Sequence, residues 1–335
     1  MPTGTGTGTR GWPKTVFDTP EWLRAWERAT AEKAAVLDDG SPPVYSLADS
    51  PFWRGYEFDV GVEPVWDRDV LTIGSVYAVF GPAYLASDPE AVAERTDRGI
   101  ELARQHGACG LFVLNLPADA AEAWAEVRPP DVQARLDLAY HQIPGAGPDP
   151  VMGALDKHDR TEWRRRWRRT TEKGVRLVEE SDPAPERIAE VIALANGSAL
   201  KHGWPQLYDQ GTVEAVLAVP GARLIRADWD GRTVAGFVAL EHDRQLHLWA
   251  GGMDHTVVRE VSPYLFLLYE LLSAGVERGW QRIEFGRGND QFKRKHGFTA
   301  VPLWSHFYAA RAEEAPAYRE RLTALHDGLA RFQAQ

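Results

Sequence analysis

The stretch RIEFGRGNDQFKRKHGF, residues 282–298, decides how the rest of the chain is interpreted. Its first four residues alternate polar and apolar side chains, which predicts a short strand. The strand breaks at the Gly-Arg-Gly of residues 286–288, and a short basic helix starts near Asp290. Glycines let a ligand approach the backbone, and a helix start offers N–H groups to an anion. The stretch therefore predicts a phosphate site with positive charge from Arg287 and Lys293; the alternative is a plain turn before a solvated basic helix.

The same stretch resembles the C-terminal signature of the FemAB-like and BioF-associated branch of the GNAT acyltransferase superfamily. That signature is a strand, then Phe-Gly-Arg-Gly, a Lys a few residues on, and a closing Gly. The matching positions here are Phe285, Gly286, Arg287, Gly288, Lys293 and Gly297. The resemblance implies that Lys293 contacts a phosphate of the donor or the acceptor. We expect Lys293 to be exposed, so that it contributes to binding and little to folding stability.

Length and composition predict a two-domain globular protein. The chain has 335 residues, of which 44% are hydrophobic and 26% charged, and this length suits two cores better than one. No run of about 18 apolar residues is present that could span a membrane. The N-terminus is a Gly-Thr repeat without the apolar core of a secretory signal, so we expect residues 1–16 to be a disordered tail.

The cysteine and charge content limit which cellular compartments and which binding partners are plausible for the protein. Cys109 is the only cysteine, which excludes a disulfide framework and a cysteine zinc site, and we expect no metal and a cytoplasmic protein. Because apolar residues 111–113 follow it, Cys109 is predicted to be a buried thiol on a strand. The net charge of −10 argues against a surface that binds nucleic acid everywhere, although a local basic groove is compatible with it.

The first half of the chain, residues 17–150, has the pattern of a βαβ unit. Its expected elements are strands at 44–47 and 70–79, a helix at 88–106 and a buried strand at 110–114. The string FDTPEWLRAWE resembles the opening of BioF-associated GNAT proteins, and YAVFGPAYL resembles the first GNAT-like half of FemAB transferases. The Pro- and Gly-rich stretch 144–150 marks the expected domain boundary.

The second half, residues 151–335, has the element order of a GNAT domain. It is expected to contain a basic helix at 155–173, a strand at 175–179, helices at 184–201 and 209–218, strands at 222–228, 233–241 and 245–251, a helix at 262–278, the strand and short helix of the opening stretch, a strand at 302–309 and a helix at 313–332. The predicted fold class is α+β, with two tandem GNAT-like domains. Each domain is expected to hold a mixed, mostly antiparallel sheet flanked by helices.

The basic helix is a candidate polyanion-binding surface. Residues 157–173 carry eight Lys or Arg against three acidic residues. The arginines proposed to contact a tRNA or the phosphates of CoA are Arg165, Arg166, Arg168 and Arg169. The alternative is a solvated helix whose Trp163 and Trp167, four residues apart, dock inward.

A second segment bears on the donor. CoA-using GNAT enzymes hold the pyrophosphate on a loop of the form R/Q-x-x-G-x-G/A, and the matching place here starts at Arg259. Ser262 and Tyr264 stand where small glycines are needed, and Pro263 removes one N–H donor. This departure puts CoA use in doubt. FemAB transferases also lack the full loop, and they take their acyl group from aminoacyl-tRNA.

These patterns leave three hypotheses for function. The leading one is an amide-forming aminoacyltransferase of FemAB type, moving an aminoacyl group from aminoacyl-tRNA to an amine or hydroxylamine of a specialised metabolite or cell-wall precursor. The second is an acyl-CoA-dependent N-acyltransferase, and the third is a non-catalytic binding protein with a GNAT fold. No tightly bound cofactor is expected. The acyl group, the acceptor and the oligomeric state stay open.

Amide formation needs an amine held against a carbonyl, a proton acceptor and a proton donor. The candidate bases are Glu241, at the end of a strand, and Glu284, although Glu241 also fits a surface position beside a hairpin. Tyr308 is the candidate proton donor to the leaving group. His247 and Trp249 alternate along one strand face and are expected to line the cleft; a core position for His247 is the alternative.

Overall fold

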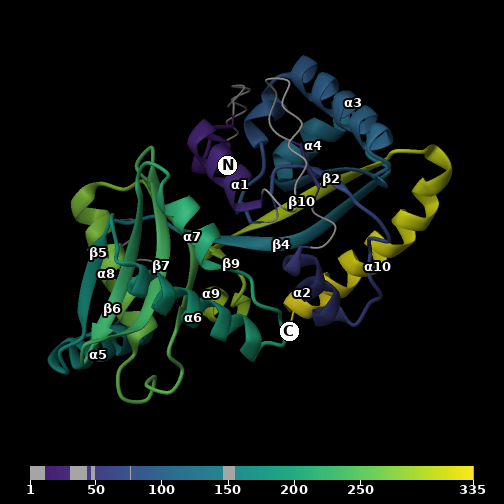
Figure 1. Ribbon diagram of the computed structural model, residues 1–335. Helices are drawn as coiled ribbons and strands as arrows, with labels where there is room; N and C mark the ends of the chain where they lie inside the picture. The colour runs from purple at the N-terminus through teal and green to yellow at the C-terminus, as the bar shows by residue number, and fades with distance from the viewer. Residues whose placement is uncertain (1–11, 31–43, 47–49, 76, 146–154, 335) are drawn as a thin grey trace, which may run out of the picture.

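A computed structural model describes residues 12–30, 44–46, 50–75, 77–145 and 155–334. Their strands join into one mixed sheet of ten strands, ordered β1-β2-β3-β10-β4-β9-β8-β7-β6-β5, with helices on both faces (Figure 1). Seven neighbouring pairs are antiparallel, and only β2 with β3 and β8 with β9 are parallel. The predicted fold class is therefore confirmed, although the two halves share one continuous sheet. The predicted disordered tail lies almost wholly outside the described residues.

The N-terminal half supplies strands at one end of the sheet. Its elements are η1 (Val16–Asp18), α1 (Pro20–Thr30), β1 (Val44–Ser46), α2 (Pro51–Val60), β2 (Leu71–Ile73), η2 (Ala83–Ser87), α3 (Pro89–Gln105), β3 (Gly110–Pro117), α4 (Ala118–Val127) and β4 (Val132–Gln142). The predicted strand at 70–79 is much shorter than expected, and α2, α4 and β4 were not predicted. Helix α2 begins where Ser50 accepts a hydrogen bond from the backbone N–H of Phe52 and Pro51 occupies the first helical position.

The C-terminal half follows the predicted order closely. Its elements are α5 (Lys157–Glu172), β5 (Arg176–Glu180), α6 (Pro185–Lys201), α7 (Gln210–Leu217), β6 (Ala222–Trp229), β7 (Arg232–His242), β8 (Gln245–Met253), α8 (Pro263–Arg278), β9 (Arg282–Arg287), α9 (Asp290–Lys295), β10 (Thr299–Ala309), η3 (Ala312–Glu314) and α10 (Ala315–Ala334). Most bounds differ from the predicted ones by one or two residues. None of the helices in the described ranges is long and apolar enough to cross a membrane.

The end of the chain returns to the N-terminal half. Strand β10 lies between β3 and β4 and is antiparallel to both, and α10 packs against β4 and α2 (Figure 1). Strand β4 in turn pairs with β9 and so joins the two halves through the backbone. The sequence boundary near residue 150 stays a prediction, but in space the last strand and helix belong with the first half.

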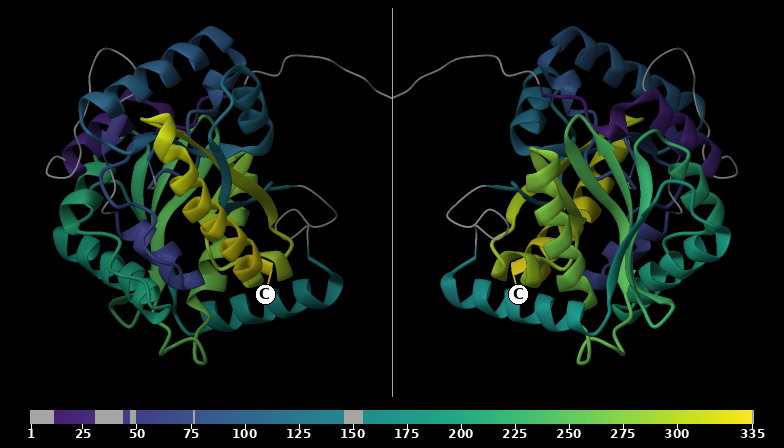
Figure 2. Two further views of the ribbon diagram at one scale, coloured as in Figure 1. Left: turned by 90° about the vertical axis from the view of Figure 1, so that its right-hand side faces the viewer. Right: turned by 90° about the vertical axis from the view of Figure 1, so that its left-hand side faces the viewer.

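Four hydrophobic clusters fill the space between the sheet and its helices. In the C-terminal half, α5 and α8 cover one face of the sheet and α1, α6 and α7 cover the other (Figure 2). In the N-terminal half, α2 and α10 cover one face and α3 and α4 the other. The junction between β4, β8 and β9 is therefore enclosed by helices from both halves.

Candidate functional site

Three residues at the end of β9 and in the turn after it have a left-handed backbone conformation. Gly286, Gly288 and Asn289 have φ angles of 64°, 72° and 55°. At Gly286 a Cβ would also lie 3.1 Å from the carbonyl oxygen of Leu248, so glycine is required there. At Gly288 no described atom lies within 4 Å of such a Cβ, so the glycine serves only the backbone angle. The turn exists as predicted, and Gly288 is exposed.

Lys293 holds this turn from inside. Its side chain is 2% exposed, and Nζ donates hydrogen bonds to the carbonyl oxygens of Phe285, Gly286 and Arg287 at 2.8, 3.2 and 3.1 Å. An ammonium group has three protons, and all three are used. Burial lowers the pKa of Lys293 to about 8, partly opposed by the Asp290, Asp137 and Glu284 carboxylates. The expectation of an exposed lysine is therefore wrong, and no proton is left for a phosphate.

Arg287, the other cation of the motif, lies at the junction of the two halves. Its guanidinium donates a hydrogen bond to the hydroxyl of Tyr56 at 3.1 Å, and Tyr56 donates to the carboxylate of Asp137 at 2.7 Å. Nε of Arg287 lies 3.7 Å from the same carboxylate, and the guanidinium lies over the ring of Phe52, 4.9 Å from its centroid. The N-terminal half thus positions this arginine, and its phosphate contact stays a prediction.

A row of ionisable side chains crosses three adjacent strands beside this turn. His247 of β8 is level with Glu284 of β9, which is level with His141 of β4, so the three share one face of the sheet. Glu284 contacts the guanidinium of Arg282, while its Oε2 and Nδ1 of His247 have no hydrogen-bond partner among the described residues. The β8–β9 ladder ends at His247 and Glu284, so the two strands separate directly after the row.

Burial controls the protonation of this row. It raises the pKa of Glu284 to about 7, against the opposing charges of Arg282 and Lys293. It lowers the pKa of His247 to about 3 and that of His141 to about 4, with a smaller contribution from Arg282 in both cases. At neutral pH both imidazoles are uncharged and the Glu284 carboxyl is partly ionised. Of the predicted bases, Glu284 is thus the one that can exchange a proton near pH 7.

The structure does not support the predicted base Glu241. Its carboxylate accepts hydrogen bonds from Trp280 at 2.9 Å and Arg223 at 2.8 Å. Burial acts to raise the pKa of Glu241, but these hydrogen bonds outweigh it and lower the pKa. Glu241 is also level with Leu246, at the end of β8 opposite to the glycine turn. It is an ion-paired structural residue near the surface.

Tyr308, the predicted proton donor, lies far from the glycine turn. Val301 is level with Ala139, which is level with Arg287, and Tyr308 lies seven residues further along β10. At about 3.3 Å per residue, this is a separation on the order of 20 Å. The Tyr308 hydroxyl donates a hydrogen bond to the carbonyl of Arg128 at 2.8 Å, within the N-terminal half. The sequence alone gave no measure of this distance.

Trp249 joins the two halves as a core residue. Its Nε1 donates a hydrogen bond to the carbonyl oxygen of Tyr77 at 2.7 Å. Its ring meets Trp22 and Tyr208 edge to face, with centroids 5.7 and 5.2 Å away. Trp249 is 7% exposed and His247 1%, so neither lines an open cleft, contrary to expectation.

In the loop before α8, where the resemblance places a pyrophosphate, the amides of residues 260–262 are already hydrogen-bonded within the protein. The N–H groups of residues 260–261 both donate to the carbonyl of Val257 at 2.9 Å. The N–H of Ser262 donates to Oγ1 of Thr170 at 3.2 Å, and Pro263 has none. A pyrophosphate held by these backbone amides would have to displace the protein's own contacts.

Helix α5 closes this loop from outside. The guanidinium of Arg169 donates hydrogen bonds to the carbonyl oxygens of Arg259 and Glu260 at 2.7 and 3.0 Å. Arg169 therefore holds the loop in place by hydrogen bonds to its backbone. Arg259 is exposed and takes part in this contact through its carbonyl oxygen. Trp167 stacks on Tyr269, with centroids 4.6 Å apart, and so attaches the same helix to α8.

The other predicted arginines of α5 face solvent. Arg165 and Arg166 both contact the carboxylate of Glu162 on their own helix, at 2.8 and 2.7 Å, yet their side chains remain 63% and 47% exposed. Arg168 is also exposed. The ridge of exposed arginines exists as predicted, and its contact with a polyanion stays a prediction.

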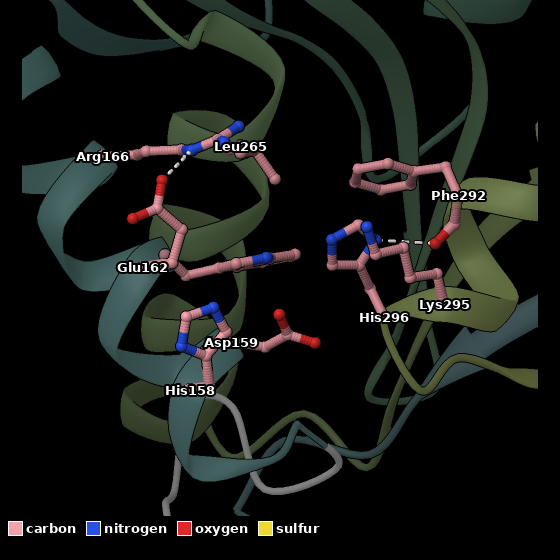
Figure 3. Close-up of a pocket in the computed structure, with 9 residues that line it drawn as sticks. His158, Asp159, Glu162, Arg166, Leu265, Phe292, Lys295 and His296 are labelled. Atoms are coloured by element: carbon pink, nitrogen blue, oxygen red, sulfur yellow. Dashed lines mark hydrogen bonds and ion pairs between the residues drawn. The ribbon is translucent and has the colours of Figure 1, made fainter.

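A pocket of about 420 Å³ opens between α5, the start of α8 and α9 (Figure 3). Its lining residues are His158, Asp159, Glu162, Trp163, Arg166, Leu265, Phe292, Lys295 and His296. Its α9 wall begins two residues after Gly288, so the pocket lies beside the glycine turn. The pocket was not predicted from the sequence, because its α5 and α9 walls are more than a hundred residues apart in the chain.

Comparison with known proteins agrees with this architecture. Residues 157–294 match the family model of the acetyltransferase (GNAT) domain, which spans α5 to most of α9. No curated protein sequence matches the chain.

Similar solved structures cover nearly the whole chain. FemX has a TM-score of 0.60 at 10% identity, covering 90% of this chain and 96% of FemX. The C-terminal domain of a putative lysylphosphatidylglycerol synthetase from Agrobacterium fabrum has a TM-score of 0.56 at 13% identity, covering 91% and 93%. The L-PGS of Bacillus licheniformis has a TM-score of 0.55 at 12% identity, covering 92% and 97%. The chain thus has the fold of these proteins, and residues 157–294 match the GNAT domain.

The sequence analysis missed the N-terminal residues of the site. Tyr56 lies on α2, which was not predicted, and Asp137 and His141 lie on β4, also not predicted. No local signal marked Asp137, because it occupies a polar position in an alternation whose apolar positions include Leu136 and Leu138. A buried charge of this kind needs a partner, and here it is the Tyr56–Arg287 pair.

Proposed function

We propose that the chain is an amide-forming aminoacyltransferase that takes its aminoacyl group from aminoacyl-tRNA. The observation that carries the proposal is the occupied loop before α8. Arg169 and Thr170 of α5 bind the backbone where CoA-using GNAT enzymes hold a pyrophosphate. An aminoacyl-tRNA ester needs no such cradle, and FemAB-like transferases work without it. The exposed arginines of α5 offer the polyanion contacts that a tRNA donor needs.

The acceptor is an amine or hydroxylamine of a specialised metabolite or cell-wall precursor. Its nitrogen attacks the ester carbonyl, the C–N bond of the amide forms, and the C–O bond to the tRNA ribose breaks. A base takes the proton that the attacking nitrogen loses and returns it to the ribose oxygen, which leaves as a hydroxyl. We assign this base to Glu284, because its pKa of about 7 suits proton transfer at neutral pH and its Oε2 has no hydrogen-bond partner among the described residues. Since Glu284 is 1% exposed, the proton reaches it through one bound water.

Hydroxylamine provides a direct test, since its acylation yields a hydroxamate from either donor. The purified chain is supplied with ¹⁴C-aminoacyl-tRNA or ¹⁴C-acetyl-CoA, and labelled hydroxamate is measured above the rate without protein. We expect product from aminoacyl-tRNA alone. Product from acetyl-CoA alone would overturn the proposal.

The α5 ridge is tested by charge reversal. Replacing Arg165 and Arg168 with Glu should weaken tRNA binding about tenfold or more and reduce its dependence on salt concentration. Arg24→Glu on α1 is the matched control, because Arg24 is an exposed arginine that pairs with its own helix at Glu21 in the same way. Equal loss in both variants would mean that the ridge has no specific role.

The second candidate is an acyl-CoA-dependent N-acyltransferase. The match of residues 157–294 to an acetyltransferase model favours it. Mass spectrometry of the denatured protein separates the two candidates, since a CoA user purified from cells carries CoA, whereas a tRNA user shows a raised 260/280 nm absorbance ratio at low salt.

A further inference from the structure

Two opposite charges face each other across the pocket between α5 and α9. The Asp159 carboxylate projects from the α5 side toward Lys295, the last residue of α9, and His296, which follows it (Figure 3). Asp159 acts electrostatically on the imidazole of His296, so the two walls are close. In the described part of the chain, neither the side chain of Asp159 nor that of Lys295 has an ion pair or a hydrogen bond. The other two charges of the lining, Glu162 and Arg166, neutralise each other at 2.7 Å.

The floor of the pocket is apolar, with one unsatisfied donor. Trp163, Leu265 and Phe292 supply the apolar surface. Trp163 is only 4% exposed, and its indole N–H has no acceptor among the described residues. A buried donor without a partner costs about 1–3 kcal/mol, and a ligand that brings an acceptor would remove that cost.

We propose that this pocket binds the zwitterionic head of an α-amino acid and that this amino acid is the acceptor of the reaction. This inference rests on the function proposed above. The ammonium pairs with Asp159, and the carboxylate pairs with Lys295 and accepts from the indole of Trp163. An ammonium held by a carboxylate keeps its proton and is not a nucleophile, so the attacking nitrogen belongs to the acceptor's side chain. The acceptor class is therefore an α-amino acid with a second amine, whose aliphatic chain lies on Leu265 and Phe292.

The volume and position of the pocket agree with this class. About 420 Å³ lies within the range of small-molecule sites. The α9 wall follows directly from the glycine turn at the end of β9, and this is the direction in which we expect the acceptor's side chain to extend.

Binding of L-lysine and L-ornithine to the full chain, measured by isothermal titration calorimetry, tests the proposal. Two lysine analogues separate the contributions of the two charged groups to binding. 6-Aminohexanoate lacks the α-ammonium, and cadaverine lacks the carboxylate. Both should bind about 10- to 100-fold more weakly than L-lysine, as expected for loss of a charge-assisted contact. The Asp159→Asn variant should bind L-lysine more weakly by a similar factor and bind 6-aminohexanoate as the wild type does. The Lys295→Gln variant should also bind L-lysine more weakly, and its affinity for cadaverine should be unchanged.

Lys157→Gln is the matched control, because Lys157 is an exposed lysine of α5 that does not line the pocket. It should leave all affinities unchanged. The proposal is overturned if neither amino acid binds below about 10 mM, or if Asp159→Asn weakens L-lysine and 6-aminohexanoate equally. The titration contains no donor and the hydroxamate assay contains no amino-acid acceptor, so each idea can fail while the other stands.

Discussion

Replacing Lys293 with methionine should destabilise the fold strongly. Methionine keeps much of the buried aliphatic chain but removes the ammonium, so the carbonyl oxygens of Phe285, Gly286 and Arg287 lose a donor together. Each unsatisfied buried group costs about 1–3 kcal/mol, and breaking a buried charged contact costs about 3–5 kcal/mol. Partial rehydration of the turn favours the lower figure for each carbonyl. We therefore expect the free energy of unfolding to fall by about 3–5 kcal/mol.

Thermal unfolding followed by circular dichroism measures this loss. At about 2–4 °C per kcal/mol, Tm should fall by about 6–20 °C. Lys295→Met is the matched control, since Lys295 lies two residues away on α9 and is exposed; its Tm should stay within about 2 °C of the wild type. If Lys293→Met unfolds at the wild-type temperature, Lys293 does not hold the turn and the exposed position expected from sequence is correct after all.

Three further predictions concern buried titratable groups. Because burial raises the pKa of Glu284 from 4.5 to about 7, the wild type should lose about 3 kcal/mol of stability as pH rises from 4.5 to 7; urea titrations at both pH values should show no such loss in Glu284→Gln. Because burial lowers the pKa of His306 from 6.5 to about 4, its contribution is present above pH 6.5 and is lost as pH falls to 4, so His306→Leu should shift acid unfolding to lower pH; an unchanged midpoint would contradict this. Burial raises the pKa of Cys109 to about 12, so its thiol should react with Ellman's reagent only in denaturant, and Cys109→Ala should keep its activity within about tenfold.

The second half of the fold could be read from the sequence because its signals are local. Hairpin turns such as Asp230-Gly231, the cap and proline at Ser262-Pro263, and the stop at Gly279 each mark an element within a few residues. Strand β4 could also have been predicted, since Val132, Ala134, Leu136, Leu138 and Tyr140 alternate with other residues, although Pro129 and Pro130 directly before it are typical of irregular structure. Helix α2 has a weaker pattern, because Gly55 and three charged residues lie among its apolar residues.

The site could be predicted only in part, because its properties depend on neighbours distant in sequence. Spacing located the glycine turn and placed Lys293 on a helix behind it, but which face of α9 is buried depends on Trp163 and Tyr264, which pack against Phe292. Likewise, Glu284 was named as a base from alternation alone. Its raised pKa follows from burial, which only the assembled sheet creates.

The position of β10 has a consequence for synthesis of the protein. Strands β3 and β4 leave the ribosome early, yet the strand that lies between them is made after the whole GNAT domain. Until then each exposes an edge with unpaired backbone groups, which is a template for pairing with other chains. A nascent chain that stalls before residue 299, or a fragment cut there by a protease, therefore retains an N-terminal half that cannot close its sheet, and such species become substrates for chaperones or for degradation.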